Sequence, residues 1–251
     1  MAKRYELSET QWVQIRELLP GKLSDPGRTA VDNRNFVNAV LWVLRSGARW
    51  SDLPERYGKW KTAHKRFTRW AKAEVWEKVF ASLVKDRDNP YLMLDSTIVK
   101  AHQQAVTGKG GARNQAVGRS RGGLTTKIHL VADSAGRPLR FLLTPGQAAD
   151  ITSAPELLAG LKAKAVIADK GYDSRALRDL VRAKRMRVVI PSKANRKRAI
   201  RYDKEIYKQR NLVERCFNKL KHFRRIATRF DRLDCHFMGV LHLAATMIWL
   251  K

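Results

Sequence analysis

The chain has 251 residues, of which 44% are hydrophobic, and 51 Lys and Arg against 23 Asp and Glu give it a formal net charge of +28. This length allows one large domain, or one ordinary domain with a small one, and the hydrophobic content excludes wholesale disorder. The charge indicates a polyanionic partner. Nucleic acid fits better than a membrane, because no apolar stretch reaches the roughly 18 residues that a span needs.

Two features of the sequence predict a cytoplasmic protein. Residues 1–22 alternate in charge and lack the apolar run of a secretory signal. Cys216 and Cys235 are the only cysteines, and neither belongs to a C-x-x-C pair, which predicts a chain without disulfides.

The first 88 residues are expected to be helical. Ser8 and Gln11 form a capping box that begins one helix, and Pro20-Gly21 ends it. Asp32 is expected to cap a second helix, which runs to Ser46-Gly47. The positions of these signals predict two short helices before residue 48.

A basic amphipathic stretch follows a short connector. It covers Lys59 to Lys72, and a further helix is expected from about Glu74 to Val84. This succession is typical of a helix-turn-helix module, although an ordinary helical bundle would give a similar pattern. The basic stretch supplies three candidate DNA contacts: Lys65, Arg66 and Arg69.

From Pro90 the hydrophobic period becomes that of strands. Tyr91–Leu94 is a short apolar run that ends at Asp95, and Thr126–Ala132 alternates before a hairpin turn into Leu139–Leu143. The intervening segment, Gln103–Gly123, is rich in Gly and Arg, and we expect a mobile loop beside a site.

Strands and helices are then expected to alternate. Asp150 is expected to cap a helix that ends at Leu161. The remaining elements are a strand Ala165–Ala168 ended by Asp169, a helix from about Ser174 to Arg185, a strand Arg187–Ile190, a long helix around Glu214 and a C-terminal helix, roughly Phe237–Leu250. This order predicts an α/β fold with a mixed sheet and helices on both faces.

One edge of the long helix carries an acid among cations. At ~100° per residue, Tyr207, Arg210, Glu214 and Lys221 fall on the same edge, between an apolar face and a wet basic face. The nearby cations would keep the Glu214 carboxylate ionised and would hold a phosphate near it.

Three acids on different elements could meet at one place. Asp95 and Asp169 each end an apolar run, and Glu214 would approach from a helix. Carboxylates in this number are suited to divalent metal and to phosphodiester chemistry, in which two Mg²⁺ ions about 3.5–4 Å apart serve the attacking and leaving oxygens. Taken singly, each acid also fits a strand end, a Gly turn or a surface salt bridge. Turn or cap roles are adequate for three rival acids: Asp133, Asp150 and Asp173.

The positive charge is clustered around these acids. Between Lys193 and Arg232 there are fifteen Lys and Arg against four acids, and between Lys100 and Arg140 there are eight against Asp133 alone. A solvated surface is the plain interpretation. Because the excess borders the candidate acids, a channel for phosphates is favoured.

Several segments resemble the DDE transposases of bacterial insertion sequences. These are Leu94–Thr97, Gly118–Gly123, Thr126–His129, Thr144–Gln147, Ala168–Asp173 and the pattern Tyr-x2-Arg-x3-Glu-x6-Lys at 207–221. The likeness extends over roughly 90–250, and the helical part before it resembles the DNA-binding region of such enzymes.

The resemblance implies a ribonuclease-H-like domain at 89–251, with a mixed five-stranded sheet flanked by helices, preceded by a small all-α, helix-turn-helix-like DNA-binding domain at 1–88. It implies that Asp95, Asp169 and Glu214 bind two Mg²⁺ ions, with Mn²⁺ as a substitute. Tyr207, Arg210 and Lys221 would hold the phosphates of the element's ends. Further candidate DNA contacts lie in the matching segments: Arg119, Arg121 and Lys127.

The implied reaction is hydrolysis at the terminal inverted repeats, followed by attack of the freed 3′-hydroxyl on target DNA. A homo-oligomer would hold two ends together in a synaptic complex, and the protein would associate with the bacterial nucleoid. Two alternatives stay open: a nuclease of the same fold, and a repressor that uses residues ~30–75. A zinc site at Cys235, His236 and His242 is disfavoured, because the ligands are too few and too closely placed for a four-ligand site.

Overall fold

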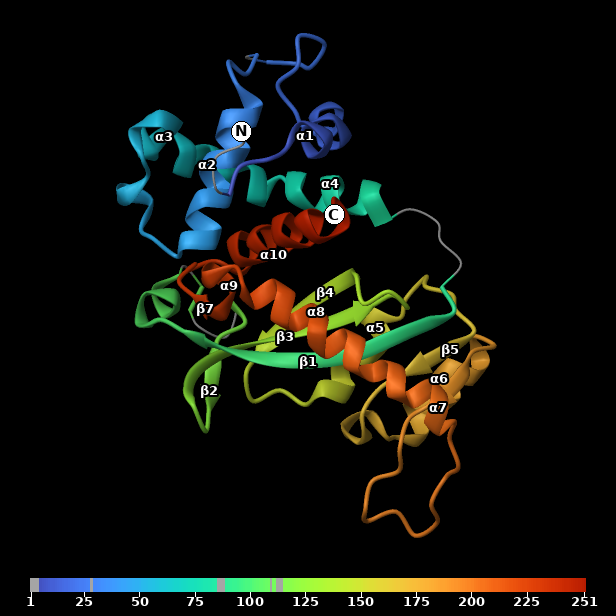
Figure 1. Ribbon diagram of the computed structural model, residues 1–251. Helices are drawn as coiled ribbons and strands as arrows, with labels where there is room; N and C mark the ends of the chain where they lie inside the picture. The colour runs from blue at the N-terminus through green and yellow to red at the C-terminus, as the bar shows by residue number, and fades with distance from the viewer. Residues whose placement is uncertain (1–4, 28, 85–88, 109, 112–114) are drawn as a thin grey trace. The chain divides into compact units, whose positions relative to one another are not determined.

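The computed structural model describes residues 5–27, 29–84, 89–108, 110–111 and 115–251 (Figure 1). These fall into two compact units: Met1–Lys85 together with Leu220–Lys251, and Asp86–Lys219. The first unit is largely helical and the second is built on a sheet. The C-terminal segment thus belongs to the same compact unit as the N-terminal helices. The functional division that we predicted at residue 88 stays a prediction.

The helical unit packs its C-terminal helix among the N-terminal ones. Its main elements are α1 (Glu9–Ile15), α2 (Asn33–Ser46), α3 (Trp60–Lys72), α4 (Val75–Val84), α9 (Arg224–Ala227), β7 (Thr228–Arg229) and α10 (Asp234–Trp249), with 3-10 turns η1 (Arg16–Leu18), η2 (Trp50–Asp52) and η3 (Glu55–Tyr57). Helix α10 contacts α3, α4 and α9, and α2 contacts α3 and α9. Since α10 is buried along most of its length, it forms the centre of this unit.

Three predicted helix ends of this unit are confirmed, at Ser8, Asp32 and Gly47, whereas the first helix ends at Ile15 and continues as η1 only to Leu18, before the expected stop at Pro20-Gly21. The Ser8 side chain accepts a hydrogen bond from the N–H of Gln11, whose own side chain accepts from the N–H of Ser8. The Asp32 side chain caps α2 through the N–H of Asn35, and Gly47 ends it in the left-handed region at φ 76°. These signals are local, and the structure follows them.

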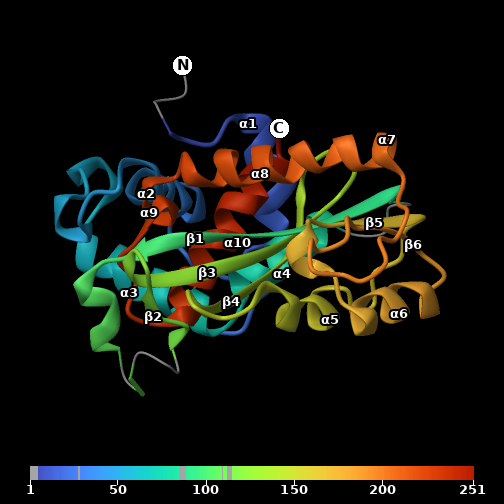
Figure 2. The same ribbon diagram turned by 90° about the horizontal axis from the view of Figure 1, so that it is seen from below.

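The sheet unit contains the strands β1 (Tyr91–Ala101), β2 (Gly118–Ser120), β3 (Gly123–Ala132), β4 (Pro138–Pro145), β5 (Ala165–Ile167) and β6 (Arg187–Val189). Its helices are α5 (Ala154–Leu157), α6 (Arg175–Ala183), α7 (Lys204–Tyr207) and α8 (Asn211–Lys221), with 3-10 turns η4 (Gln103–Thr107), η6 (Asp150–Ser153), η7 (Lys170–Tyr172) and η8 (Lys208–Arg210). Helix α8 lies over one face of the sheet, and α5 and α6 cover the other (Figure 2).

The sheet is mixed and its topology is ribonuclease-H-like. The order is β4-β3-β1-β5-β6, with β3 antiparallel to β1 and β4, and with β5 parallel to β1 and β6. The five expected strands are therefore present, and β2 extends the sheet by pairing with the start of β3. The short strand β5 is buried throughout, as a parallel strand between two neighbours and two helical layers must be.

A glycine allows the β3–β4 hairpin to approach α8. Gly136 lies in the turn at φ 71°, and a Cβ there would be 2.9 Å from the backbone oxygen of Leu212. Both the backbone angle and the close approach favour glycine at this turn.

Four expectations about the elements of this unit were wrong in detail. Asp95 lies within β1 and not at its end, because the strand continues to Ala101. The segment expected to be a loop contains η4 and β2. Asp150 does not cap a helix: the capping position of η6 is Ala149, with no side-chain bond. The helix around Glu214 is divided, since η8 separates α7 from α8.

Among the described residues, no helix has both the length and the apolar character needed to cross a bilayer.

Candidate active site

Asp95 occupies the middle of the central strand. It follows three buried residues, Leu92, Met93 and Leu94, and its backbone pairs with Leu130 of β3. Its side chain is 17% exposed. One carboxylate oxygen accepts a hydrogen bond from the N–H of Ser96 at 2.8 Å, and the other accepts from Arg210 at 3.3 Å. Pairing with β3 at this position, and with β5 up to Met93, makes this a rigid position.

Asp169 follows the neighbouring strand β5 and begins η7. Its Oδ1 accepts a hydrogen bond from the N–H of Gly171 at 2.8 Å. A Cβ at residue 171 would lie 2.9 Å from that oxygen, so the glycine permits the backbone to reach the carboxylate. The turn interpretation of Asp169 is therefore correct, since its carboxylate accepts from the N–H of the turn that it begins.

Glu214 lies in the first turn of α8, with its side chain 52% exposed. Arg210 connects it to the sheet: one Nη of the guanidinium contacts Glu214 and the other donates to Asp95. The arginine side chain is 23% exposed. A single guanidinium thus bridges Asp95 and Glu214, two acids that are 119 positions apart in the chain.

The three predicted acids are electrostatic neighbours. Burial raises the pKa of Asp95 to about 6, and the charges of Asp169 and Glu214 add to this rise. The Ser96 N–H and Arg210 lower the pKa but do not compensate. The structure therefore brings acids from β1, the end of β5 and α8 within electrostatic range of one another, with one arginine between Asp95 and Glu214.

Two tyrosines lie beside these acids. Burial raises the pKa of Tyr207, and the charge of Asp169 contributes, while Arg210 opposes the rise. Tyr172 was not singled out by sequence reasoning. It is fully buried, and burial raises the pKa of its hydroxyl, as do the charges of Asp150, Asp95 and Asp169. The sequence feature that could have identified Tyr172 is its position in Ala168–Asp173, one of the segments that resemble the transposase family.

Lys127 is held in an internal ion pair. Its ammonium lies 2.7 Å from Asp150 Oδ1, which also accepts a hydrogen bond from the Ser96 hydroxyl at 2.8 Å. The lysine side chain is 10% exposed. The structure thus gives Lys127 and Asp150 a role in fixing β1 against the segment after β4, and a DNA contact of Lys127 stays a prediction.

The remaining predicted DNA contacts differ in exposure. Arg119 and Arg121 are exposed on the β2–β3 hairpin, and Lys221 is half-buried at the end of α8. On α3, Lys65 and Arg69 are exposed, but Arg66 is half-buried. Arg66 and Arg69 line a cavity of about 1130 Å³ in the helical unit.

Arg66 is ordered by its neighbours in that cavity. Its guanidinium lies over the rings of Phe36 and Trp70, at 4.4 and 4.6 Å from their centroids, and it donates to the side chain of Asn33. These contacts fix the basic face of α3.

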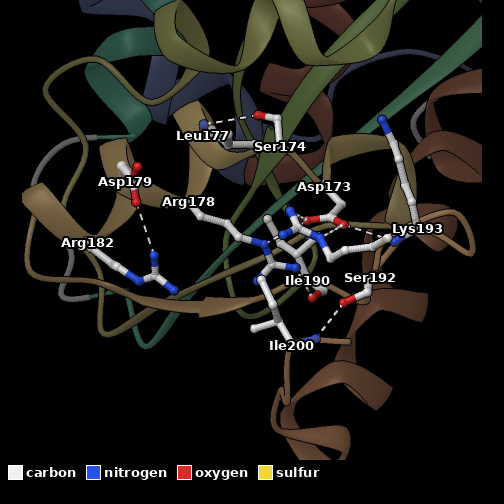
Figure 3. A network of polar contacts seen from close by, with 11 residues as sticks. Asp173, Ser174, Leu177, Arg178, Asp179, Arg182, Ile190, Ser192, Lys193 and Ile200 are labelled. Atoms are coloured by element: carbon white, nitrogen blue, oxygen red, sulfur yellow. Dashed lines mark hydrogen bonds and ion pairs between the residues drawn. The ribbon is translucent and has the colours of Figure 1, made fainter. Parts of the chain in front are cut away.

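Two rival acids are engaged elsewhere. The Asp133 carboxylate accepts from the backbone of the hairpin turn and from Arg137. Asp173 accepts from Arg178, Arg196 and the N–H of Lys193 (Figure 3). The turn role predicted for Asp133 agrees with its contacts, whereas Asp173 is held by partners that lie 5 to 23 positions later in the chain.

Carboxylate oxygens are the ligands that Mg²⁺ prefers, so the donor set at Asp95, Asp169 and Glu214 fits that ion. The charges of Asp169 and Glu214 near Asp95 also favour the binding of a cation. Within the described residues, however, no three His, Cys, Asp or Glu side chains are grouped closely enough to hold a metal as they stand. Cys235, His236 and His242 likewise do not form such a group.

Two family models and several known proteins are similar to this chain. Residues 87–248 match the family model described as "Transposase DDE domain", and residues 7–80 match "Putative transposase of IS4/5 family". The chain is 44% identical over 131 residues to the "Putative transposase for insertion sequence element IS6501" of Brucella ovis, covering 51% of this chain and 100% of that protein. It is 42% identical over 113 residues to an uncharacterised protein of Sinorhizobium fredii, covering 45% and 87%.

Among solved structures, one similar chain is the piggyBac transposase in a synaptic complex with hairpin DNA. The TM-score is 0.42 and the identity 14%, over 75% of this chain and 48% of that one. The chain therefore spans about half the length of that protein.

Proposed function

This chain belongs to the DDE transposase family, and from this premise we propose that it binds the terminal inverted repeats of a bacterial insertion sequence, cleaves DNA there and joins the freed 3′-hydroxyl to target DNA. One observation supports this most strongly. The guanidinium of Arg210 contacts both Asp95 on β1 and Glu214 on α8, and Asp169, which follows β5, lies within electrostatic range of Asp95 and Arg210.

These three acids are the proposed ligands of a divalent metal. Mg²⁺ is the proposed ion, two per site, with Mn²⁺ as a substitute. Bound Mg²⁺ would activate the attacking oxygen and stabilise the leaving oxygen during in-line displacement at phosphorus. The residues differ in their contribution. Asp95 is fixed by the pairing of β1, Asp169 by the Gly171 N–H, and Glu214 is the most exposed.

Arg210 has a proposed role in both the metal-free and the DNA-bound protein. It now offsets part of the charge of Asp95 and Glu214. A guanidinium also binds phosphate through two donors in a fixed geometry. We propose that it turns to a phosphate of the DNA when the acids receive metal. Tyr207, whose hydroxyl lies in the field of Asp169, would contact the same strand.

The other cations are proposed to bind DNA outside the reaction centre. Arg119 and Arg121 project from a hairpin of the sheet unit, and Lys65, Arg66 and Arg69 lie on α3. Lys221 completes the helical edge two turns after Glu214. Residues 1–88 would then recognise the ends and 89–251 would carry the chemistry. The proposed partners are two element ends and a target duplex, held by a homo-oligomer at the bacterial nucleoid in the cytoplasm.

Replacement of Asp169 by Ala tests the proposal. The variant should still bind DNA that contains the inverted repeats flanking the reading frame, but Mg²⁺-dependent cleavage should fall more than about 100-fold, because residues that merely orient metal ligands already contribute 10- to 100-fold. If the variant cleaved like the wild type, the site assignment would be wrong.

Joining of a pre-cleaved end to plasmid DNA distinguishes a transposase from a nuclease. Wild-type protein should form joined products with Mg²⁺, and a nuclease would release ends without joining them. A repressor would show neither activity, and its binding and function would be indifferent to Asp169→Ala.

A further inference from the structure

A basic loop joins β6 to α7 in the sheet unit. Residues 191–203 contain no helix or strand, and the cations of the loop and of the helix that follows it are Lys193, Arg196, Lys197, Arg198, Arg201 and Lys204. Arg196 is half-buried, and the others are exposed. Within the described part of the chain, Lys197, Arg198 and Arg201 form no ion pair, so their charge faces solvent.

Asp173 holds this loop in place through contacts with Lys193 and Arg196. Its carboxylate lies 2.9 Å from Arg196 Nε and 2.9 Å from Arg196 Nη2, and it also accepts from the N–H of Lys193 at 2.9 Å. Arg178, itself 2% exposed, donates to the same carboxylate at 2.7 Å and to the carbonyl of Ile190 at 2.8 Å (Figure 3). One buried acid thus holds both the start of the loop and its inward arginine.

The loop is also closed on itself. The Ser192 hydroxyl accepts a hydrogen bond from the N–H of Ile200 at 2.8 Å, which joins the two sides (Figure 3). Within it, the N–H of Arg196 donates to the carbonyl of Lys193 at 3.1 Å, forming a turn. These bonds hold Lys197 and Arg198 at the tip of a closed loop, where their like charges oppose one another.

The topology places the start of the loop at the sheet edge that carries Asp169. Strands β5 and β6 are parallel and paired, with Ile167 opposite Val189. Their ends therefore lie at the same edge of the sheet, where Asp169 follows β5 and the loop follows β6. At its other end the loop enters α7, which carries Tyr207. The loop therefore begins at the edge that carries Asp169 and leads to the helix that carries Tyr207, whose pKa the charge of Asp169 raises.

An ordinary solvated loop explains exposed cations but not this construction. Charges that serve only solubility gain nothing from being held in one place, whereas charges that bind a rigid polyanion do, because less conformational entropy is lost on binding. The ion pairs of Asp173 with buried Arg178 and half-buried Arg196 supply that fixed geometry. Asp173 itself lies four residues after Asp169.

We propose that residues 193–201 form a fixed arm that binds the phosphate backbone of duplex DNA next to the catalytic edge, with Asp173 as its anchor. This inference rests on the proposed function. Lysine and arginine contacts to phosphate carry no sequence information, so the arm binds end and target DNA alike.

Neutralising the arm tests the inference. The triple variant Lys197→Gln, Arg198→Gln, Arg201→Gln is compared with the wild type for binding to a duplex of about 30 base pairs, three helical turns, of unrelated sequence. Without metal, the slope of log affinity against log salt should fall by about 2.7, from three phosphates at roughly 0.9 each. The same decrease is expected with DNA that carries the inverted repeats.

A matched control removes the same charge from the opposite edge. Lys162 and Lys164 precede β5, and Arg185 precedes β6; all three are exposed. The variant Lys162→Gln, Lys164→Gln, Arg185→Gln should reduce the slope by less than about 1, that is, by less than one phosphate contact. Equal reductions of the salt slope in both variants would show a general effect of net charge and would overturn the proposal that residues 193–201 bind DNA as an arm.

A second variant tests the anchor. Arg196→Met removes the contact with Asp173 but leaves the three outward cations, and trypsin should then cleave more rapidly after Lys197 and Arg198. Affinity for the unrelated duplex should fall about three- to tenfold, because the arm must be ordered on binding. Faster cleavage with unchanged affinity would overturn the requirement for a fixed arm.

The two proposals fail in different ways. If wild-type protein cleaves and joins element ends but the arm variant keeps the full salt slope, the arm is wrong and the proposed function stands. If wild-type protein binds no duplex DNA, both are wrong. If the arm variant loses the slope while the wild type never cleaves, the arm stands as a DNA contact and the proposed chemistry falls.

Discussion

Asp173 and Asp95 lie in the same unit and are both shielded from water, yet their surroundings differ. Burial alone would raise the pKa of Asp173, but bonds from Arg196, the Lys193 N–H and Arg178 hold it well below its usual range. Burial raises the pKa of Asp95 to about 6, against one N–H and one arginine, with two acids nearby. Burial acts to raise the pKa of both carboxylates, and the number of fixed donors decides whether the net shift is upward or downward.

This difference separates a structural acid from a candidate ligand. The Asp173 carboxylate is saturated with donors and has little to offer an ion. The Asp95 carboxylate and its neighbours lack positive charge, which a divalent cation would supply. Asp169, four residues before Asp173, belongs with the undersupplied set, since its bond in η7 is a single backbone N–H.

The largest expected effect is on stability at the saturated acid. Asp173→Ala leaves Arg178 buried and without its carboxylate, and should reduce the free energy of unfolding by about 3–5 kcal/mol, as measured by urea denaturation. The matched control is Asp179→Ala. That side chain is 56% exposed and pairs with surface arginines, so its loss should change stability by less than about 0.5 kcal/mol. Similar losses would show that the buried cluster adds little.

The next effect concerns metal. Mg²⁺ should raise the unfolding temperature of the wild-type protein, since an ion at about 100 times its Kd adds about 2.7 kcal/mol to the folded state. Asp169→Asn should abolish this rise, and Asp173→Asn, measured by the same thermal scan, should retain it from a lower starting temperature. A rise that survives Asp169→Asn but not Asp173→Asn would reverse the two roles.

Acidification should remove the contribution of Asp173. Because its folded pKa is lowered, this contribution is complete above the unfolded pKa of about 4 and is lost as the pH falls below it, by about 1.4 kcal/mol per pH unit. The difference in unfolding free energy between wild type and Asp173→Asn should therefore be constant from about pH 7 to 5 and shrink towards pH 2. A difference that grows in acid would contradict the assigned direction.

Local signals in the sequence predicted much of the fold. The capping box at Ser8, the cap at Asp32 and the hairpin turn after Ala132 each depend on residues within a few positions, and each is present. The strand order follows from the alternation of strands and helices together with the family resemblance. The three acids were proposed from the ends of apolar runs, from a helical edge and from the family resemblance, and the structure places each on a separate element, with Asp95 inside β1 and not at its end.

Partners remote in the chain could not be predicted. Asp150 resembled a helix cap, but its oxygen accepts from Ser96, 54 positions away, and from Lys127, 23 away. Lys127 was proposed as a DNA contact because it lies in a segment that matches the family, and nothing local indicated that β3 is buried on both faces from Thr125 to Ala132. Asp173 was assigned to a turn, since nothing local indicates that Arg196, 23 positions later, returns to it.

The smallest expected effect is also the sharpest comparison. Asp95→Asn should leave the free energy of unfolding within about 1 kcal/mol of wild type, because losing the Arg210 pair is offset by removing a buried charge beside two like charges. Cleavage should nevertheless be lost, as expected where a site retains unfavourable charge for function. Asp173→Asn, studied in the same urea titration, should be clearly less stable. If Asp95→Asn destabilised the protein as much as Asp173→Asn does, Asp95 would be a structural acid like its counterpart, and the case for metal at this edge would lose its main support.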